Sequence, residues 1–316
     1  MGGRGHTRVK FLTKEIQKLM DKEEVMWHQR AKNDWLKFGD QNTKYFHCHA
    51  TERNKRNFIS GLENEQGSWV EGVDQIGALL TRYYSSLFTS GNPTQLDPVL
   101  DVVETRVSIE MNAELLKPFV EVEVQLALKQ MDANTAPRPD GLPPLFYKQF
   151  WGKIGREVTE AVLSTLNTGN IPTNLNHTVI TLIPKIQSPR RVTEFWPISL
   201  SNVLYKLITK VLGNCLKPLL PKLISETQSA FMLERLITDN ILIAHETLHY
   251  LKGKRTGMMG YMALKLDINK AYDRVEWVYL DRIMEKMGFS QRWINLISMC
   301  IRCITYLVML NGQPQV

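Results

Sequence analysis

The sequence predicts an α+β fold in which helices outnumber strands. Apolar residues recur at three- and four-residue spacing in many runs between residues 9 and 303, as they do on amphipathic helices. Two short runs are instead β-branched and strand-like, at 177–184 (HTVITLIP) and 305–310 (TYLVML). The second is followed by Asn311-Gly312, a pair typical of a tight hairpin turn.

Composition is that of an ordinary globular protein. The 316 residues are 43% hydrophobic and 22% charged, enough for a full core and two or three modules. No apolar run approaches the ~20 residues that span a bilayer, and the N-terminus lacks a secretory signal. We therefore expect an intracellular protein, nuclear or cytoplasmic, without a membrane partner.

Charge is unevenly distributed along the chain. Residues 1–57 carry a net +6, residues 58–130 a net −7 and residues 131–316 a net +8. Basic segments suit a phosphate backbone, although a merely solvated basic surface is an equal alternative. Four cysteines form no disulfide framework. Cys300 and Cys303 lie in an apolar helical run, which favours core packing over a zinc site.

The N-terminal third predicts helices and one hairpin. Residues 9–36 form an amphipathic helix with a basic outer face, and 41–56 form a second helix. Residues 58–70 form a hairpin that turns at 64–67, with Gly61 weakening its first strand. A helix is expected at 73–88.

The middle of the chain begins with an acidic stretch, 96–118, expected to be irregular. A short helix is predicted at 120–131, followed by a stiff proline-rich turn at 136–143. Two more helices are predicted, at 145–151 and 154–166.

Lys185 stands at the tip of the 177–184 strand. A lysine there can meet a triphosphate as a point charge, and ordinary solvation is the alternative. Residues 195–216 are expected to form a helix capped by Ser199 or Ser201. Residues 235–251 are expected to form a helix that faces the core.

The segment 261–277 (YMALKLDINKAYDRVEW) combines a buried strand with carboxylates. Asp267 stands at the strand's end, where a carboxylate can hold a hard cation such as Mg²⁺ or merely cap a turn. Helices follow at 278–287 and 291–303. The strand 305–310 is expected to lack a partner and to expose an aggregation-prone edge.

This string closely resembles motif A of reverse transcriptases, in the form found in non-LTR (LINE-type) retrotransposons abundant in plant genomes. The resemblance implies that Asp267 is a catalytic residue that binds the two metal ions. It implies that Tyr272 is the steric gate against a ribose 2′-hydroxyl. It also implies that backbone amides at Lys270 and Ala271 approach the incoming triphosphate.

Further segments resemble the fingers of the same family. There Lys185 matches a basic residue at the triphosphate, and Arg235 matches a residue that could hold a template phosphate, with a helix-start salt bridge as the alternative. The sequence departs from the family pattern at four positions. Trp196 and Cys215 replace arginines, and Arg138 and Glu234 replace glycines.

The resemblance also implies a domain organisation. Residues 1–92, including the string WLKFGDQNTKYFH, would be a helical leader with a hairpin, from the linker between endonuclease and polymerase. Residues 93–118 would be an acidic connector. Residues 119–316 would be the fingers and first part of the palm of a polymerase-like right hand.

We therefore expect a fragment of an RNA-directed DNA polymerase. Its intact parent would use an RNA template, a DNA primer, dNTP and Mg²⁺ in a two-metal nucleotidyl transfer. No Tyr/Phe-x-Asp-Asp string follows motif A, and no thumb, so we expect a chain truncated after motif A and inactive alone. The alternatives are a non-catalytic nucleic-acid-binding relic and a pseudogene product.

Overall fold

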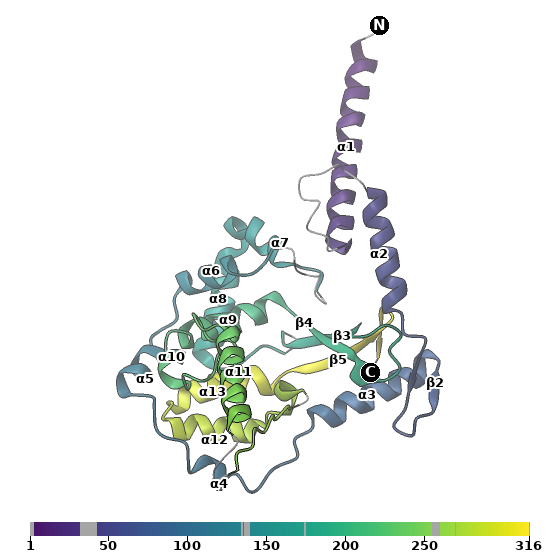
Figure 1. Ribbon diagram of the computed structural model, residues 1–316. Coiled ribbons are helices and arrows are strands. Elements are labelled where there is room, and N and C mark those ends of the chain that lie inside the picture. The colour runs from purple at the N-terminus through teal and green to yellow at the C-terminus, as the bar shows by residue number, and fades with distance from the viewer. Residues whose placement is uncertain are drawn as a thin grey trace.

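The computed structural model describes residues 3–31, 43–133, 135, 140–173, 175–254, 260–268 and 270–315. Helices surround a small four-stranded sheet, and a separate two-stranded hairpin lies beside it (Figure 1). This confirms the predicted α+β class. No helix in the described part of the chain is long and apolar enough to cross a membrane.

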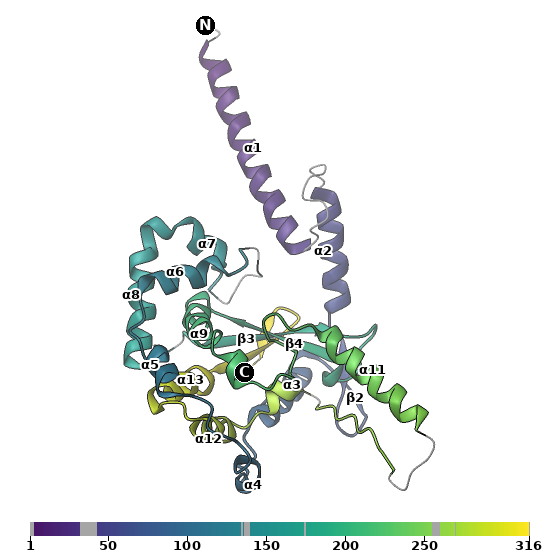
Figure 2. The same cartoon turned by 60° about the vertical axis from the view of Figure 1, so that its left-hand side comes forward.

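Two helices project from the body at the N-terminal end. They are α1 (Gly3–Ala31) and α2 (Thr43–Asn57), which lie side by side over part of their length (Figures 1 and 2). The amphipathic pattern of α1 was predicted, but its apolar stripe is exposed, with Phe11 at 63% and Leu19 at 62%. The predicted end of the first helix at residue 36 and the predicted start of the second at residue 41 lie outside the described residues.

The predicted hairpin and the helix after it are confirmed. Strands β1 (Gly61–Glu63) and β2 (Trp69–Glu71) pair antiparallel, and α3 (Val73–Phe88) follows. We expected Gly61 to weaken β1, and the structure gives it a different role. A Cβ at Gly61 would lie 2.5 Å from the Trp69 ring, so the glycine makes room for the indole that covers it.

The acidic connector is more ordered than its composition predicted. It contains two short helices, α4 (Asp97–Leu100) and α5 (Ile109–Leu115). Two of its carboxylates form ion pairs with basic side chains of α12 (Trp277–Met287). Asp97 pairs with Arg282 at 2.7 Å, and Asp101 pairs with Lys286 at 3.4 Å. The connector is therefore fastened along α12 by charge complementarity.

The larger core lies among helices. Trp293 and Leu207 are fully buried there, together with valines and leucines of α6 and α8. The helices that surround it are α6 (Glu121–Lys129), α7 (Pro144–Gln149), α8 (Trp151–Thr168), α9 (Val203–Leu216), α12 and α13 (Gln291–Arg302). The buried Cys300 belongs to this core, as expected of its CxxC pair. Of the proline-rich turn predicted at 136–143, residues 136–139, including Arg138, lie outside the described residues.

The four-stranded sheet has the order β4-β3-β5-β6. Strand β3 (His177–Pro184) pairs antiparallel with β4 (Phe195–Ser201). The prediction of a helix from residue 195 was wrong, because α9 begins only at Val203. Pro197 is the physical reason: a proline disfavours the α conformation of the residue before it and is tolerated on an edge strand such as β4.

Strand β5 (Thr305–Leu310) is an interior strand of the sheet. It pairs parallel with β3 and antiparallel with β6 (Gln313–Gln315). The expected unpaired, aggregation-prone edge at β5 is therefore wrong. The Asn311-Gly312 turn is confirmed, with φ of 50° and 86°. The Asn311 side chain also accepts from the Ile59 amide at 2.9 Å, which ties the turn to the chain before the hairpin.

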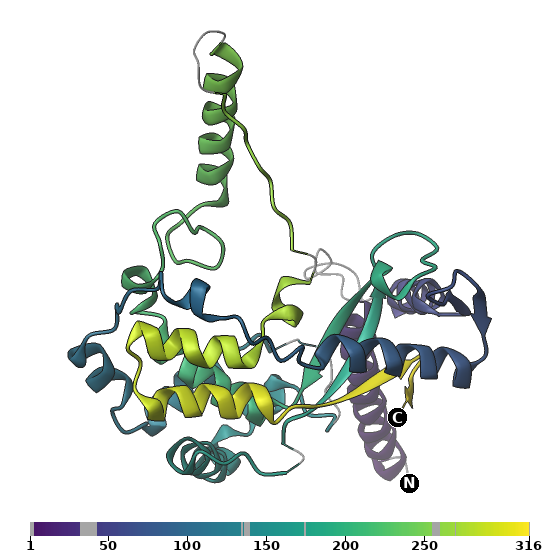
Figure 3. The same ribbon diagram turned by 90° about the horizontal axis from the view of Figure 1, so that it is seen from below.

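A second core joins the hairpin region to the sheet. Leu62 and Leu80 pack with Ile180, Phe195 and Leu310 in one cluster of buried side chains. Residues from before position 93 and from after position 119 thus share this core. The β3–β4 pair, which carries Lys185, consequently rests against the hairpin and α3 (Figure 3).

Helix α11 (Ile237–Gly253) stands away from the body (Figure 3). We expected it to face the core, and this was wrong, since no residue of α11 is buried. Ile237 is 65% exposed and Ile241 is 62% exposed. The apolar residues of α11 recur at helical spacing, which predicts an apolar face on the helix. That spacing does not specify whether another described element covers the face.

Candidate nucleotide and nucleic-acid site

Asp267 lies on an exposed, extended segment. Residues 260–268 form no strand, and the prediction of a buried strand at 261–266 was wrong. Met262 is 85% exposed and Leu266 is 80% exposed. A strand needs a hydrogen-bonded neighbour, and no described strand pairs with this segment. Within the described residues Asp267 has no hydrogen-bond or ion-pair partner, so no strand fixes its carboxylate.

The turn after Asp267 is compact. Lys270 adopts a left-handed conformation with φ of 54°, and its carbonyl accepts from the Asp273 amide at 3.0 Å. A 3₁₀ turn, η2 (Ala271–Arg274), follows. The first amides of such a turn have no partner within it and are available to an acceptor. This is the part of the chain where the sequence placed a triphosphate.

The Lys270 side chain turns back toward the body. Its ammonium lies 4.6 Å from the centre of the Tyr83 ring and 5.5 Å from that of Tyr84, both on α3. The Nζ atom is buried and makes no hydrogen bond to the described residues. Lys270 therefore anchors η2 on α3 by cation–π contacts, which leaves only its backbone for a ligand.

Tyr272 is the aromatic residue of this turn. Its side chain is 76% exposed, and its ring meets Phe231 edge-on with 5.8 Å between centroids. It borders a cleft of about 750 Å³ that is also lined by Asp273, Tyr83 and Tyr306. An exposed tyrosine at the edge of a cleft can meet a sugar, as the sequence prediction requires.

Tyr83 and Tyr306 give this cleft an aromatic lining, and Tyr84 lies next to Tyr83 on α3. Burial raises the pKa of the Tyr306 phenol, and the Asp273 carboxylate raises that pKa further. Burial also raises the pKa of Tyr84, and the neighbouring Tyr83 and then Asp273 raise that pKa further. The two phenols therefore stay neutral beside the carboxylate. At the other side of the cleft, the Glu276 carboxylate accepts from Ser90 Oγ at 2.6 Å and from the Gly91 amide at 2.9 Å.

Lys185 lies in the β3–β4 connection. Its Nζ donates to the Thr193 carbonyl at 2.8 Å and lies 4.6 Å from the centre of the Trp196 ring. Its backbone amide donates to the Glu194 carbonyl at 2.8 Å. The ammonium thus rests on the aromatic side chain that stands where the family has an arginine.

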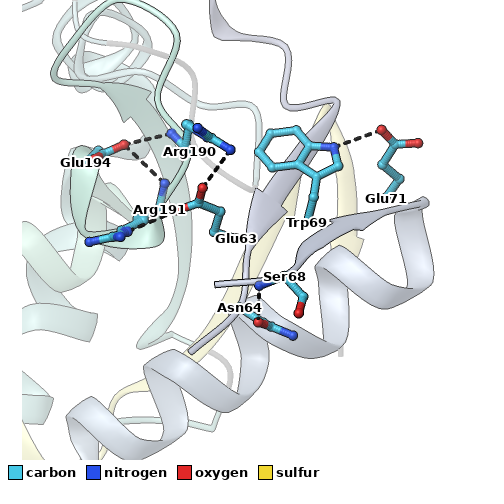
Figure 4. A network of polar contacts seen from close by, with 8 residues as sticks. All are labelled: Glu63, Asn64, Ser68, Trp69, Glu71, Arg190, Arg191 and Glu194. Atoms are coloured by element: carbon cyan, nitrogen blue, oxygen red, sulfur yellow. Dashed lines mark hydrogen bonds and ion pairs between the residues drawn. The ribbon is translucent and has the colours of Figure 1, made fainter. Parts of the chain in front are cut away.

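The connection that carries Lys185 is held by the hairpin. Glu63 of β1 pairs with Arg190 at 2.8 Å and with Arg191 at 3.1 Å, although its own side chain is only 11% exposed (Figure 4). Glu194 accepts from the backbone amides of both arginines, and these bonds lower the pKa of its carboxyl. Figure 4 also shows Trp69 beside Arg190. Sequence reasoning missed this network, because nothing in the spacing links residue 63 to residues 190 and 191.

Arg235 holds a loop together. Its guanidinium donates to the carbonyls of Ser225 and Gln228, at 2.5 and 2.8 Å. Among the described residues it has no carboxylate partner, so the alternative of a helix-start salt bridge is not observed. The next residue back, Glu234, has φ of 64°, a conformation that favours the glycine of the family pattern.

The predicted site residues fall into separate groups. Lys270, Ala271 and Tyr272 share one turn, with Asp267 on the segment before it. Arg235 lies in the loop that brings Phe231 to Tyr272. Within the described residues, no hydrogen bond or cation–π contact of the Lys185 side chain reaches these groups; its partners are Thr193 and Trp196. Phe231 was missed by sequence reasoning as a contact of Tyr272, because no periodic pattern connects a loop residue to a distant turn.

The site residues lie in a segment that matches a known family. A family described as Reverse transcriptase (RNA-dependent DNA polymerase) matches residues 183–315. The C-terminal part of the chain is similar to the reverse transcriptase family. All six predicted site residues lie inside the matched segment, which we call the reverse transcriptase domain. This domain has a polymerase-like fold, as the sequence resemblance implied.

Two retrotransposon proteins are similar to the chain. One is the Transposon TX1 uncharacterized 149 kDa protein of Xenopus laevis, 27% identical over 274 residues, which are 86% of this chain and 21% of the relative. The other is the Retrovirus-related Pol polyprotein from type-1 retrotransposable element R2 of Popillia japonica. It is 24% identical over 182 residues, 58% of this chain and 24% of the relative. They bear out the resemblance to reverse transcriptases of LINE-type elements, and the chain spans less than a quarter of each relative.

Reverse transcriptases generally act with divalent metal ions, so the donor set of this reverse transcriptase domain matters. Asp267 is its one predicted metal ligand, and it lies on an exposed segment. No group of three or more histidine, cysteine, aspartate or glutamate side chains with metal-binding geometry occurs in the described ranges. A two-metal site needs several oxygen ligands around ions ~3.5–4 Å apart. The described residues therefore do not fit such a site.

Proposed function

We propose that the chain supplies the fingers and first part of the palm of an RNA-directed DNA polymerase. It would bind an RNA template, a DNA primer and a dNTP. The observation that carries this proposal is the turn at 270–274 in the reverse transcriptase domain, where Tyr272 is 76% exposed at the edge of a cleft. The exposed turn offers backbone amides and a sugar-facing ring on one surface.

Each predicted residue has a role in this proposal. The amides at Lys270 and Ala271 contact the triphosphate, and Tyr272 excludes a ribose 2′-hydroxyl. Lys185 adds a positive charge from the β3–β4 connection. Arg235 orders the loop beside Tyr272 through its two carbonyl contacts, and its guanidinium is close enough to the surface to meet a template phosphate.

Mg²⁺ belongs to this proposal with one restriction. Asp267 would be a metal ligand when further carboxylates join it. Because the described residues offer one such carboxylate on an exposed segment, we propose that the 316-residue chain does not polymerise by itself. The domain division at residues 92 and 118 and the plant form of the element stay predictions.

A non-catalytic role in nucleic-acid binding is the second candidate. The basic segments 1–57 and 131–316, with net charges of +6 and +8, favour it, because basic segments suit a phosphate backbone. The replacement of family arginines by Trp196 and Cys215 favours drift toward a pseudogene product, because neither side chain offers a charge to a phosphate. Cys215 instead donates to the Glu123 carboxylate at 3.6 Å, inside the fold.

One experiment tests the proposed inactivity and the nucleic-acid binding that both candidates share. The purified 316-residue chain is mixed with a fluorescent RNA–DNA primer–template, and binding and Mg²⁺-dependent primer extension are both measured. We expect salt-sensitive binding that survives Asp267→Ala, without extension. Extension that is abolished by Asp267→Ala would overturn the proposed inactivity. Failure to bind primer–template at low salt would overturn nucleic-acid binding altogether.

A further inference from the structure

Two histidines lie one turn apart on the exposed helix α11. They are His245 and His249, the first and last residues of the string HETLH. Their rings are nearly parallel, with 14° between the ring planes and 6.5 Å between the ring centroids. A spacing of four residues places both side chains on one face of the helix. We call this feature the α11 histidine pair.

Both imidazoles are open to a ligand. The His245 side chain is 75% exposed, and His249 is exposed as well. Among the described residues, the His249 ring makes no hydrogen bond or ion pair and contacts only the His245 ring. The Glu246 carboxylate lies 3.9 Å from Nδ1 of His245, which is too far for a hydrogen bond. Within the described part of the chain, neither ring therefore serves to hold the fold together.

The geometry of the α11 histidine pair suits one metal ion. Neutral imidazole is the commonest metal ligand in proteins, and its bond to zinc is ~2.0–2.1 Å long. Two rings that share an ion lie somewhat closer together than the 6.5 Å between these centroids. Exposed side chains change rotamer within nanoseconds, and neither ring has to break a described hydrogen bond in order to turn. The same H-E-x-x-H spacing on a helix holds zinc in metalloproteases.

Glu246 supports metal binding by His245. Its carboxylate lies on the Nδ1 side of the ring. A carboxylate in that position favours the tautomer with the proton on Nδ1, and the other nitrogen, Nε2, is then free for an ion. Histidines that bind a metal commonly donate their second ring N–H to a carboxylate in this way. The negative charge also favours the approach of a cation.

The two nitrogen ligands select the class of ion. Imidazole suits zinc, nickel and copper, whereas Mg²⁺ prefers oxygen ligands. The α11 histidine pair is therefore chemically different from the carboxylate of Asp267. No group of three or more potential metal ligands occurs in the described ranges, so water would fill the other positions of the ion. Hydrolytic zinc centres have three protein ligands, and the described residues do not supply the third.

A metal ion here would supply support that α11 lacks. No residue of this 17-residue helix is buried, and the helix stands away from the body (Figure 3). Helices shorter than ~12–15 residues are marginal in water, and most helical stability comes from tertiary packing. An ion that joins residues four apart binds both rings only while that turn is helical. Metal binding therefore stabilises the helical form of α11 over its unfolded form.

We infer that the α11 histidine pair binds a divalent ion of the zinc, nickel and copper class. One ring nitrogen of His245 and one of His249 are the ligands, and the bound ion holds α11 in helical form. The helix lies between the loop of Arg235 and the segment that carries Asp267, so the ion orders the connection between them. This inference does not rest on the proposed function, because neither nucleic acid nor Mg²⁺ enters it.

The test titrates the 316-residue chain with ZnCl₂, NiCl₂ or MgCl₂ in a calorimeter. Hydrogen–deuterium exchange of α11 is then measured without metal and at a zinc concentration ten times Kd. The variants are His245→Ala and His249→Ala, and alanine favours helix at both positions. The matched control is His47→Ala with His49→Ala on α2. Those two histidines are two residues apart and point to different sides of their helix. Thermal unfolding is recorded for every variant.

Either single variant should lose one equivalent of bound zinc. Removal of one of two ligands should weaken binding by at least about tenfold, since loss of even an outer partner has an effect of that size. In the unchanged chain, zinc at ten times Kd should slow exchange in α11 about tenfold. Neither single variant should show this protection, and the α2 control should keep it. Ni²⁺ should bind, and Mg²⁺ should not.

Several results would overturn the inference. Unaltered zinc binding in both single variants would place the ion elsewhere, and loss of the zinc site in the α2 control would assign it to α2. Equal protection of α11 by Mg²⁺ and Zn²⁺ would indicate a carboxylate site. Zinc that binds without slowing exchange in α11 would remove the proposed effect on the helix, and a chain that binds no zinc would end the inference. Primer–template binding is measured separately, so the proposed function does not depend on any of these outcomes.

Discussion

The Lys185 ammonium lies 4.6 Å from the centre of the Trp196 ring, on the paired strands that the hairpin supports. A cation–π contact of this kind contributes about 0.5–1 kcal/mol at an exposed site. The Trp196 ring also covers one side of the Lys185 ammonium. Trp196 thus replaces a family arginine with a side chain that holds Lys185 and adds no charge of its own.

Trp196→Arg should therefore increase affinity for dNTP. The substitution restores a guanidinium that can bind a phosphate in two places, and it releases Lys185 from the ring. We expect about a tenfold gain, measured by titration of the chain with a fluorescent dNTP analogue. Trp196→Phe is the control, because it keeps an aromatic surface and adds no charge. Equal affinity in both variants would contradict this role for position 196.

Glu63→Gln should loosen the β3–β4 connection. Glu63 is 11% exposed and pairs with two arginines that are themselves 65–67% exposed, so screening by solvent limits the loss. We expect about 1 kcal/mol less free energy of unfolding and faster hydrogen exchange in residues 185–194. Glu65→Gln is the matched control, an exposed glutamate of the same hairpin without a described partner. Equal exchange in the two variants would show that the network does not hold the connection.

Gly288→Ala should destabilise the end of α12. Gly288 has φ of 92°, and an added Cβ would lie 2.8 Å from the Thr105 methyl and 3.1 Å from the Val107 carbonyl oxygen. Backbone strain and this contact together should cost about 1–3 kcal/mol. Gly152→Ala, at a helical position with open space around it, should be neutral or slightly stabilising. Urea unfolding of both variants gives the comparison, and equal midpoints would be inconsistent with the structure.

The thiols should differ in reactivity. Burial raises the pKa of Cys300 from 9.0 to about 12, and burial followed by the Glu123 carboxylate does the same for Cys215. At pH 8 each then holds about 1000-fold less thiolate than a thiol of pKa 9.0. Iodoacetamide should modify the exposed Cys48 first, as read by mass spectrometry. Rapid labelling of Cys300 in the folded chain would contradict its place in the core.

The same pKa shifts give a direction for stability against pH. The folded thiols titrate above their ordinary value, so their contribution is complete below pH 9 and is lost as pH rises from 9 toward 12. Between pH 7 and the alkaline range, the free energy of unfolding should therefore fall less in a Cys300→Ala variant than in the unchanged chain. A parallel pH profile in both proteins would show that the Cys300 thiol does not contribute.

Elements with a local signal were predicted well from the sequence. The helix at Val73–Phe88 and the strands at His177–Pro184 and Thr305–Leu310 follow from short-range periodicity and turn residues. The failures concern partners far away in sequence. The partner of β5, the exposure of α11 and the unpaired segment 260–268 depend on which other elements lie nearby, and residue spacing does not specify that.

The candidate site divides in the same way. Asp267, Tyr272 and the amides around them came from one contiguous string with a family resemblance. Phe231 against Tyr272, Glu63 against Arg190, and Lys185 on Trp196 are contacts between distant or unrelated positions.

The central claim is that this chain binds a primer–template through the surface around Tyr272. Hydrogen–deuterium exchange with and without an RNA–DNA primer–template and dNTP tests it most directly. We predict slower exchange in residues 260–275, in the loop 225–236 and in the β3–β4 connection, with the projecting helix α1 little changed. Protection confined to α1 and α2, or no protection anywhere, would contradict the claim.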